Sequence, residues 1–283
     1  GNGVKRPVYT RPEKNKYSNL IYLSNSSKGY SYNITGTLSK DFGFGLDASI
    51  AYTFGESKAA NDGLSSQAVS NWKYNYSYDI NGDELYYSNF DMRHRIVGQL
   101  NYRVEYAKNF ATTIGLVYNG QSGPRYSVLY SSDVNGDGER NDLLYLPESA
   151  TSKPDSKVTY EQFLKDHKDL AAYRGKVIPR NALMAPFFHK FDLHFAQDFF
   201  LNVGGRRHTL QLNADIINLG NLLNRGWGMS PYIQYDNITP IAISTDRATG
   251  NPVYSFTHHR STPWDYSDIN SRWRAQVGIK YTF

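Results

Sequence analysis

The chain has 283 residues, of which 40% are hydrophobic, and it carries a formal net charge of +5. No apolar run approaches the roughly 20 residues that a transmembrane helix needs, so any membrane-spanning form of this chain must be a β-barrel. The basic residues are dispersed rather than gathered in a block with aromatics, which argues against a nucleic-acid partner. The absence of cysteine from the sequence excludes disulfides and thiolate metal sites.

The N-terminal part of the sequence predicts little regular structure. Residues 1–17 contain Pro7 and Pro12, which are typical of irregular or edge structure. Residues 19–24 form a short candidate strand, and Asn, Ser and Gly at 25–29 predict a turn. We therefore expect the ordered part of the fold to begin after this turn.

From residue 30 onward, apolar and polar residues alternate with a period of two. Successive side chains of a β-strand point to opposite faces of a sheet, so this alternation predicts strands. The alternating stretches are residues 30–40, 44–54, 92–106, 110–118, 191–199, 210–216 and 271–283. Most approach or exceed the roughly nine to eleven residues of a membrane-spanning strand, and with residues 19–24 they give about eight strands.

The last stretch, residues 271–283, has the clearest pattern. Its apolar face includes Val277, Ile279, Tyr281 and Phe283, and its other face carries Arg274, Gln276 and Lys280. The polar face suits a hydrated lumen, and aromatics at both ends of the apolar face suit the two membrane interfaces. Taken alone, this stretch is also compatible with an edge strand of a soluble sheet.

The connections between the predicted strands alternate in length. Short turns near residues 41, 108 and 203 alternate with long connections over 55–90, 120–188 and 219–271. This asymmetry is typical of an outer-membrane barrel, with tight periplasmic turns and long extracellular loops, and it argues against a soluble sandwich. The second connection predicts one helix, because Thr159 and Gln162 fit a capping box ahead of an apolar face that ends before Gly175.

Charged residues on the predicted strands share the face opposite to the apolar one. They are Arg93, Arg95, Arg103, Glu105, Asp192, Asp215, Arg274 and Lys280, together with Asp47. We interpret them as lumen-facing charges that pair with one another in contact with water; the alternative is that they grip a plug or a passing ligand.

No enzymatic activity is expected. The sequence contains no HExxH, GxSxG, GxxxxGK or GxGxxG motif. The histidines His94, His258 and His259 have no partners in the pattern that would complete a metal or catalytic site, so we interpret them as polar residues of the rim or of a loop.

The segment Asp133–Asp142, with the sequence DVNGDGERND, resembles the opening of an EF-hand calcium loop. Asp133, Asn135 and Asp137 occupy loop positions 1, 3 and 5, and Gly138 occupies position 6. Glu139 would offer its carbonyl, and Asn141 or Asp142 a further oxygen. Position 12 is Leu144, where a bidentate acid is expected, so calcium is a candidate cofactor and an Asx-rich turn without metal is an equal alternative.

Several motifs resemble a known family. The strings are DMRHR (91–95), YNGQSGPRYS (118–127), DVNGDGERNDLLYLP (133–147), YRGKVIPRN (173–181), HKFDLHFAQDF (189–199) and ADIINLGNLLN (214–224). In this order and spacing they are similar to the closing third of TonB-dependent outer-membrane receptors, and most to the Oar-like branch with a carboxypeptidase-regulatory-like domain. The resemblance covers residues from about 18 to the end.

The resemblance implies a fold, a location and partners. Such receptors are all-β, antiparallel transmembrane barrels of 22 strands closed by a plug, located in the cell outer membrane, and they take up substrate with energy delivered through TonB. The sequence has no plug, no TonB box and no regulatory-like domain, so we expect residues 1–283 to be the C-terminal barrel part of such a receptor. The expected partners are outer-membrane lipid, the remainder of the receptor, TonB through that remainder, and the barrel assembly machinery, for which Val277, Ile279, Tyr281 and Phe283 would be the signal.

Two other functions remain open at this stage. The chain could be an autonomous small barrel of about eight strands that acts as a porin or an adhesin. Less in keeping with the motifs, it could be an outer-membrane hydrolase with acids and histidines at its rim.

Overall fold

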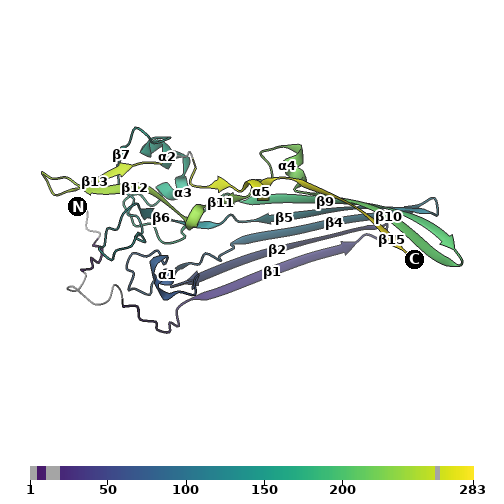
Figure 1. Ribbon diagram of the computed structural model, residues 1–283, viewed down its shortest axis with the longest axis horizontal. Helices are drawn as coiled ribbons and strands as arrows, with labels where there is room; N and C mark the ends of the chain where they lie inside the picture. Colours follow the sequence, from purple (N-terminus) through teal and green to yellow (C-terminus); the bar gives the residue numbers. More distant parts are fainter. Residues whose placement is uncertain (1–4, 11–19, 259–261) are drawn as a thin grey trace.

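The computed structural model describes residues 5–10, 20–258 and 262–283, and a long antiparallel sheet dominates it (Figure 1). The strand order in this eight-stranded sheet is β1-β2-β4-β5-β9-β10-β15, and β3 pairs with β2. The strands are β1 (Tyr30–Asp41), β2 (Leu46–Ala59), β3 (Tyr86–Tyr87), β4 (His94–Tyr106), β5 (Phe110–Gln121), β9 (Phe188–Val203), β10 (Arg206–Ile217) and β15 (Arg274–Thr282). The prediction of an all-β chain with mostly antiparallel strands is confirmed.

The N-terminal predictions have a mixed outcome. Residues 20–24 do not form a strand, so the short candidate strand at 19–24 is wrong over the part that the structure describes. Asn19 lies outside the described residues, as do residues 1–4 and 11–18. Residues 5–10 are irregular, as the prolines predict.

The register of the sheet brings residues of one kind into rows across the strands. One row consists of Tyr106, Phe110, Phe199, Leu210 and Tyr281, each the Cα partner of the next. The neighbouring polar row consists of Glu105, Ala111, Asp198, Gln211 and Lys280. Because a slip of one residue would exchange the two faces, the alternation along each strand fixes this register.

Tight turns join the long strands at one end of the sheet. Gly204 and Gly205 link the partners Val203 and Arg206, and both glycines have positive φ, +59° and +77°. Two consecutive residues with positive φ make the type I′ turn, whose twist matches that of the two flanking strands. In Figure 1 these turns and the C-terminus lie at the right-hand end of the sheet.

The three long connections, residues 60–93, 122–187 and 218–273, contain further secondary structure and gather mainly at the other end of the sheet (Figure 1). A second sheet has the order β7-β13-β12-β6-β8, and β11 pairs with β14. Its strands are β6 (Arg125–Tyr130), β7 (Thr151–Ser152), β8 (Leu183–Met184), β12 (Asn237–Thr245) and β13 (Pro252–Phe256), and the pair is β11 (Pro231–Tyr232) with β14 (Asp265–Tyr266). The helices are α1 (Ala68–Lys73), α2 (Tyr160–Asp166), α3 (Lys168–Ala171), α4 (Leu219–Leu223), α5 (Asp268–Ser271) and the 3₁₀ turn η1 (Gln234–Asp236).

The predicted helix between residues 159 and 175 is two helices. Thr159 caps α2 as expected, because its side chain accepts a hydrogen bond from the Gln162 N–H. The reciprocal half of the capping box is not formed, since the Gln162 side chain donates to Asp166 instead. The helix breaks at His167, whose φ of −123° and ψ of 75° are not helical.

The hydrophobic core lies in the long connections rather than on the long sheet. Its members include Tyr126 and Val128 of β6, Phe163 of α2, Ile241 of β12 and Phe256 of β13. Phe163 and Phe256 have ring centroids 5.3 Å apart, which suits a tilted aromatic contact. The long connections are therefore folded units with a core of their own, whereas the sequence predicted long loops with a single helix.

The long sheet has two outer edges. Within the described part of the chain, β1 pairs only with β2, and β15 pairs only with β10. The same described residues contain no helix that is long and apolar enough to cross a membrane.

Candidate functional site

The apolar face of the long sheet is open to its surroundings. Ile34 and Leu38 of β1, Ile50 of β2, Ile114 of β5 and Val277 of β15 are all exposed. Monomeric soluble proteins rarely expose a contiguous apolar patch of more than a few hundred Å². A sheet face of this size therefore needs an apolar environment to cover it.

Aromatic residues lie near both ends of this apolar face. Near the tight turns, the rings of Tyr106 and Phe110 stack with centroids 5.8 Å apart. Near the long connections, the Tyr118 hydroxyl lies 2.8 Å from Nδ1 of His189, and the Tyr52 hydroxyl lies 2.8 Å from Nδ1 of His94. His94 thus lies on the apolar side, where a tyrosine satisfies its ring. Rings with a polar tip at the two ends of an apolar band are typical of membrane interfaces.

The C-terminal strand carries its apolar residues on the same open face. Val277 has 79% of its surface exposed and Phe283 80%, and Ile279 and Tyr281 are also exposed. The register partners of Val277, Ile279 and Tyr281 on β10 are Ala214, Leu212 and Leu210, respectively. The four residues predicted as an assembly signal therefore form one exposed row at the edge of the sheet.

The opposite face carries a network of charged and polar groups. Arg103 donates from Nη1 to Oδ2 of Asp198 at 2.8 Å, and Gln211 donates from Nε2 to Oδ1 of Asp198 at 2.7 Å. Glu105 lies 3.5 Å from Arg103 and 3.8 Å from Arg207. One buried carboxylate thus joins β4, β9 and β10 across the polar face.

The other predicted lumen-facing charges fall into two groups. Asp215 lies 2.6 Å from Nδ1 of His194, Asp192 lies 3.1 Å from Nζ of Lys190, and Arg93 donates to Glu56 at 2.7 Å. Among the described residues, Arg95, Arg274 and Lys280 make no ion pair. Five of the eight predicted residues thus contact an acidic or basic side chain, but only Arg103 and Glu105 contact each other, and the other three contact residues outside the predicted set. The lumen itself stays a prediction.

The segment Asp133–Asp142 is a compact Asx-rich turn. Oδ1 of Asp133 accepts from the N–H groups of Asn135 and Gly136 at 3.1 and 2.7 Å, and its Oδ2 accepts from Gly138 at 2.8 Å. Asp137 accepts from the Glu139 N–H at 2.7 Å. Across the described residues, no three His, Asp or Glu side chains are placed to hold a metal. Calcium binding stays a prediction, and the backbone already uses the carboxylates proposed for it.

A guanidinium from the N-terminal segment occupies the far end of this turn. Arg6 donates to Oδ1 of the buried Asp142 and to the carbonyl of Leu143. Burial raises the pKa of the Asp142 carboxyl. Two groups oppose this shift: the Val134 N–H, whose nitrogen lies 2.9 Å from Oδ2, and the Arg6 guanidinium. Glu139 forms an ion pair with Lys73 at 3.0 Å. The cations that face this loop are thus side chains of the same protein.

A buried ion pair that the pattern analysis did not single out joins the first two long connections and, through Asp91, the end of β2. Arg125 of β6 donates from Nε to Oδ2 of Asp91 at 2.5 Å, and its guanidinium carbon lies 3.6 Å from the ring centroid of Tyr87. Asp91 also accepts from the Ser57 N–H of β2 at 2.7 Å. The partners are 34 residues apart in the chain, so no spacing signal could have predicted the pair.

Comparison with known families agrees with this geometry. The family described as outer membrane beta barrel domain matches residues 2–239. The chain belongs to this family. The search of curated proteins and the search of solved structures returned no match.

The outer membrane beta barrel domain is located in the outer membrane, as predicted. The location accounts for the two unlike faces of the long sheet. Lipid covers the exposed apolar face without cost, whereas the paired charges of the polar face need water or polar protein.

Proposed function

We propose that this outer membrane beta barrel domain is the closing part of a TonB-dependent receptor of the Oar-like branch and acts in substrate uptake rather than in catalysis. One observation carries the proposal: the outer edges of β1 and β15 pair with no other described strand. An unpaired N–H or C=O group in the hydrocarbon core costs several kcal/mol, so both edges require further strands. A plugged, 22-stranded wall would supply them.

The rest of the chain suits this role. The charged face with Arg103, Asp198 and Glu105 would face the lumen, where a plug is held and a ligand passes. The three long connections would lie outside the cell, where their folded core places binding surfaces in front of the lumen. The tight turns would then face the periplasm.

Cysteine cross-linking tests which strands β1 and β15 contact. Residues 1–283 contain no cysteine, and any cysteine in the remainder of the receptor is replaced by serine, so the introduced pairs report without background. Each test pair combines one Cys in β1, at Ser31 or Thr37, with one Cys in β15, at Gln276 or Thr282. All four positions lie on the polar face, and the experiment uses the complete receptor in outer-membrane vesicles. The positive control is Ser39→Cys with Ser49→Cys, which are register partners of β1 and β2.

We expect a bismaleimide to link the control pair and none of the β1–β15 pairs. Efficient β1–β15 links would mean that the sheet closes on itself, and the chain would then be an autonomous small barrel of porin or adhesin type. The TonB step has its own test, in which the complete receptor retains the periplasmic domain of TonB on an affinity column.

A further inference from the structure

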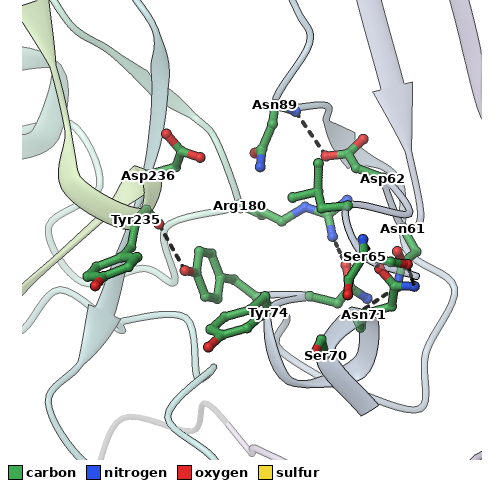
Figure 2. A pocket seen from close by; sticks show the side chains of 13 residues that line it. Asn61, Asp62, Ser65, Ser70, Asn71, Tyr74, Asn89, Arg180, Tyr235 and Asp236 are labelled. Atoms are coloured by element: carbon green, nitrogen blue, oxygen red, sulfur yellow. Dashed lines mark hydrogen bonds between the residues drawn. The ribbon is translucent and has the colours of Figure 1, made fainter. Parts of the chain in front are cut away.

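A pocket of about 370 Å³, lined by polar, charged and tyrosine side chains, opens among the long connections (Figure 2). Its wall comes from the segment 61–76, which follows β2, from Arg180, and from Tyr235 and Asp236 of η1. A cavity of this size holds a side chain or a small ligand. Its charged lining residues are Asp62, Asp236 and Arg180.

The Arg180 guanidinium is part of the framework of the pocket. It is buried, and its Nη atoms donate to the carbonyls of Ala59 and Ala60, at 2.6 and 3.1 Å, and to Oδ1 of Asn75. These bonds use three of the five N–H groups of the guanidinium. Of the other two, Nε–H is shielded from solvent and has no partner among the described residues, and one N–H of Nη2 is left. Arg180 therefore contributes charge to the pocket and uses most of its donors in the framework.

Two side-chain amides of the pocket hold its loop. Asn61 accepts from the Gly63 N–H at 2.8 Å and donates to the Asn71 carbonyl at 3.2 Å. Asn71 accepts from the Ser65 N–H and donates to the Ser65 carbonyl, at 2.8 and 2.6 Å. Nδ2 of Asn75 and Nδ2 of Asn89 donate to no described residue, so these two amide donors are left for a ligand.

Two carboxylates remain available to a ligand. Asp62 accepts from the Asn89 N–H through Oδ2 at 2.9 Å, which leaves Oδ1 free. The half-buried side chain of Asp236 has neither a hydrogen bond nor an ion pair to any described residue, and burial raises its pKa. In Figure 2 its carboxylate lies on the side of the pocket opposite Asp62, above the ring of Tyr235.

The backbone holds Asp236 in this place at a cost. Tyr235 and Asp236 both have positive φ, +58° and +54°, a conformation that L residues rarely adopt. The Tyr235 carbonyl accepts from the Tyr76 hydroxyl at 2.9 Å and from Nδ2 of Asn237 at 2.9 Å, which holds the turn in position. The strained turn presents an unpartnered carboxylate beside two exposed tyrosines, Tyr74 and Tyr235.

We propose that this pocket binds an organic monocation, such as the ammonium group of a lysine side chain on an extracellular peptide. Two carboxylates against one guanidinium leave the lining with one uncompensated negative charge. The free charged groups are carboxylates, and an ammonium, which has three donors and no acceptor, is their complement. The rings of Tyr74 and Tyr235 provide surfaces on which the aliphatic part of such a side chain can pack.

A neutral polyol fits this inventory less well. Its hydroxyls find donors in the phenols and in the amides of Asn75 and Asn89, but a neutral ligand leaves the negative charge of Asp236 uncompensated. The inference rests on the proposed function in one respect only, namely that the long connections lie outside the cell and the ligand arrives from there. Equilibrium binding in detergent needs neither TonB nor transport, so a failure here is distinguishable from a failure of the proposed function.

The test measures peptide binding to the complete, detergent-solubilised receptor by calorimetry in 150 mM salt. The probe is a trilysine peptide with blocked termini, and the neutral probes are the same peptide with acetylated side chains and maltotriose. Asp236→Asn removes the charge and suits the left-handed conformation, because Asn tolerates positive φ. Asp62→Asn is a second variant, and Asp268→Asn, which removes an exposed carboxylate paired with Arg272, is the matched control.

We expect trilysine to bind and the acetylated peptide not to bind. Asp236→Asn should lower the affinity about ten-fold or more, the size of a lost charge-assisted hydrogen bond, and Asp268→Asn should leave it within about two-fold. Unchanged affinity in both Asp236→Asn and Asp62→Asn would overturn the proposal. Binding of maltotriose in place of trilysine would also overturn it, because the pocket would then select a neutral ligand.

Discussion

The buried pair of Arg125 and Asp91 shows how single residues attach the long connections to the sheet. Arg125 is stacked on Tyr87 and is 4% exposed. Removing one member of a buried ion pair leaves an uncompensated charge, which costs about 3–5 kcal/mol. We therefore expect Asp91→Ala to lower the unfolding free energy by about that amount, measured as the denaturant dependence of protease resistance in detergent.

An exposed ion pair is the control for this prediction. Asp268 pairs with Arg272 at the i,i+4 spacing, and both side chains are largely exposed. Pairs of this kind contribute about 0–1 kcal/mol, so Asp268→Ala should have a small effect. Equal losses in the two variants would show that the buried pair does not hold the two parts together.

The turn at Asp133 permits a second prediction at the scale of residues. Asp133 satisfies three backbone N–H groups, so Asp133→Ala should destabilise the turn by about 1–3 kcal/mol whether or not calcium is present. Thermal unfolding of the protein in detergent, with millimolar calcium or with chelator, measures this loss. A melting temperature that calcium raises in the natural protein but not in Asp133→Ala plus Asp137→Ala would instead identify a metal site.

Some properties of these residues could be predicted from the sequence, and others could not. The period of two placed Arg103, Glu105 and Asp215 on one face, because strand geometry depends only on local order. It did not predict the contact of Arg6 with Asp142, whose partners are 136 residues apart. Such pairs depend on tertiary folding of the long connections, which leaves no periodic signal.

At the scale of elements, the C-terminal strand carries a prediction about assembly. Phe283 ends the exposed row of Val277, Ile279 and Tyr281, which is the surface that an assembly factor could recognise before lipid covers it. We expect deletion of Phe283 from the complete form of the proposed receptor to lower the amount of heat-modifiable barrel in the membrane. Lys280→Ala, on the other face of β15, is the control, and normal assembly of the deletion would contradict the idea.

The elements differ in how well local sequence predicts them. The long strands were predictable because alternation over nine or more residues is a strong signal, and their ends moved by only a few residues. The strands of the second sheet were not predicted. β7 and β8 have two residues each, and β6 is buried at every position, so neither length nor alternation distinguishes them.

At the scale of the whole molecule, the two parts of the fold are stabilised differently. The long connections bury Tyr126, Phe163 and Ile241 in a core of the kind that water-soluble domains have. The long sheet instead holds its strands by hydrogen bonds and the polar network, and leaves its apolar face to lipid. Sequence composition averages over both parts, so it did not predict that the long connections contain a folded hydrophobic core.

The unpaired edges of the long sheet lead to the last prediction. Residues 1–283, refolded alone in detergent or lipid, should give neither a heat-shifted monomer band nor stable single-channel conductance. The reason is that the free N–H and C=O groups of β1 and β15 would face hydrocarbon at several kcal/mol each. The complete receptor, treated in the same way, should give the heat-shifted band. A stable, closed monomer of residues 1–283 would show that β1 and β15 find each other, and that the sheet is a small barrel rather than part of a larger wall.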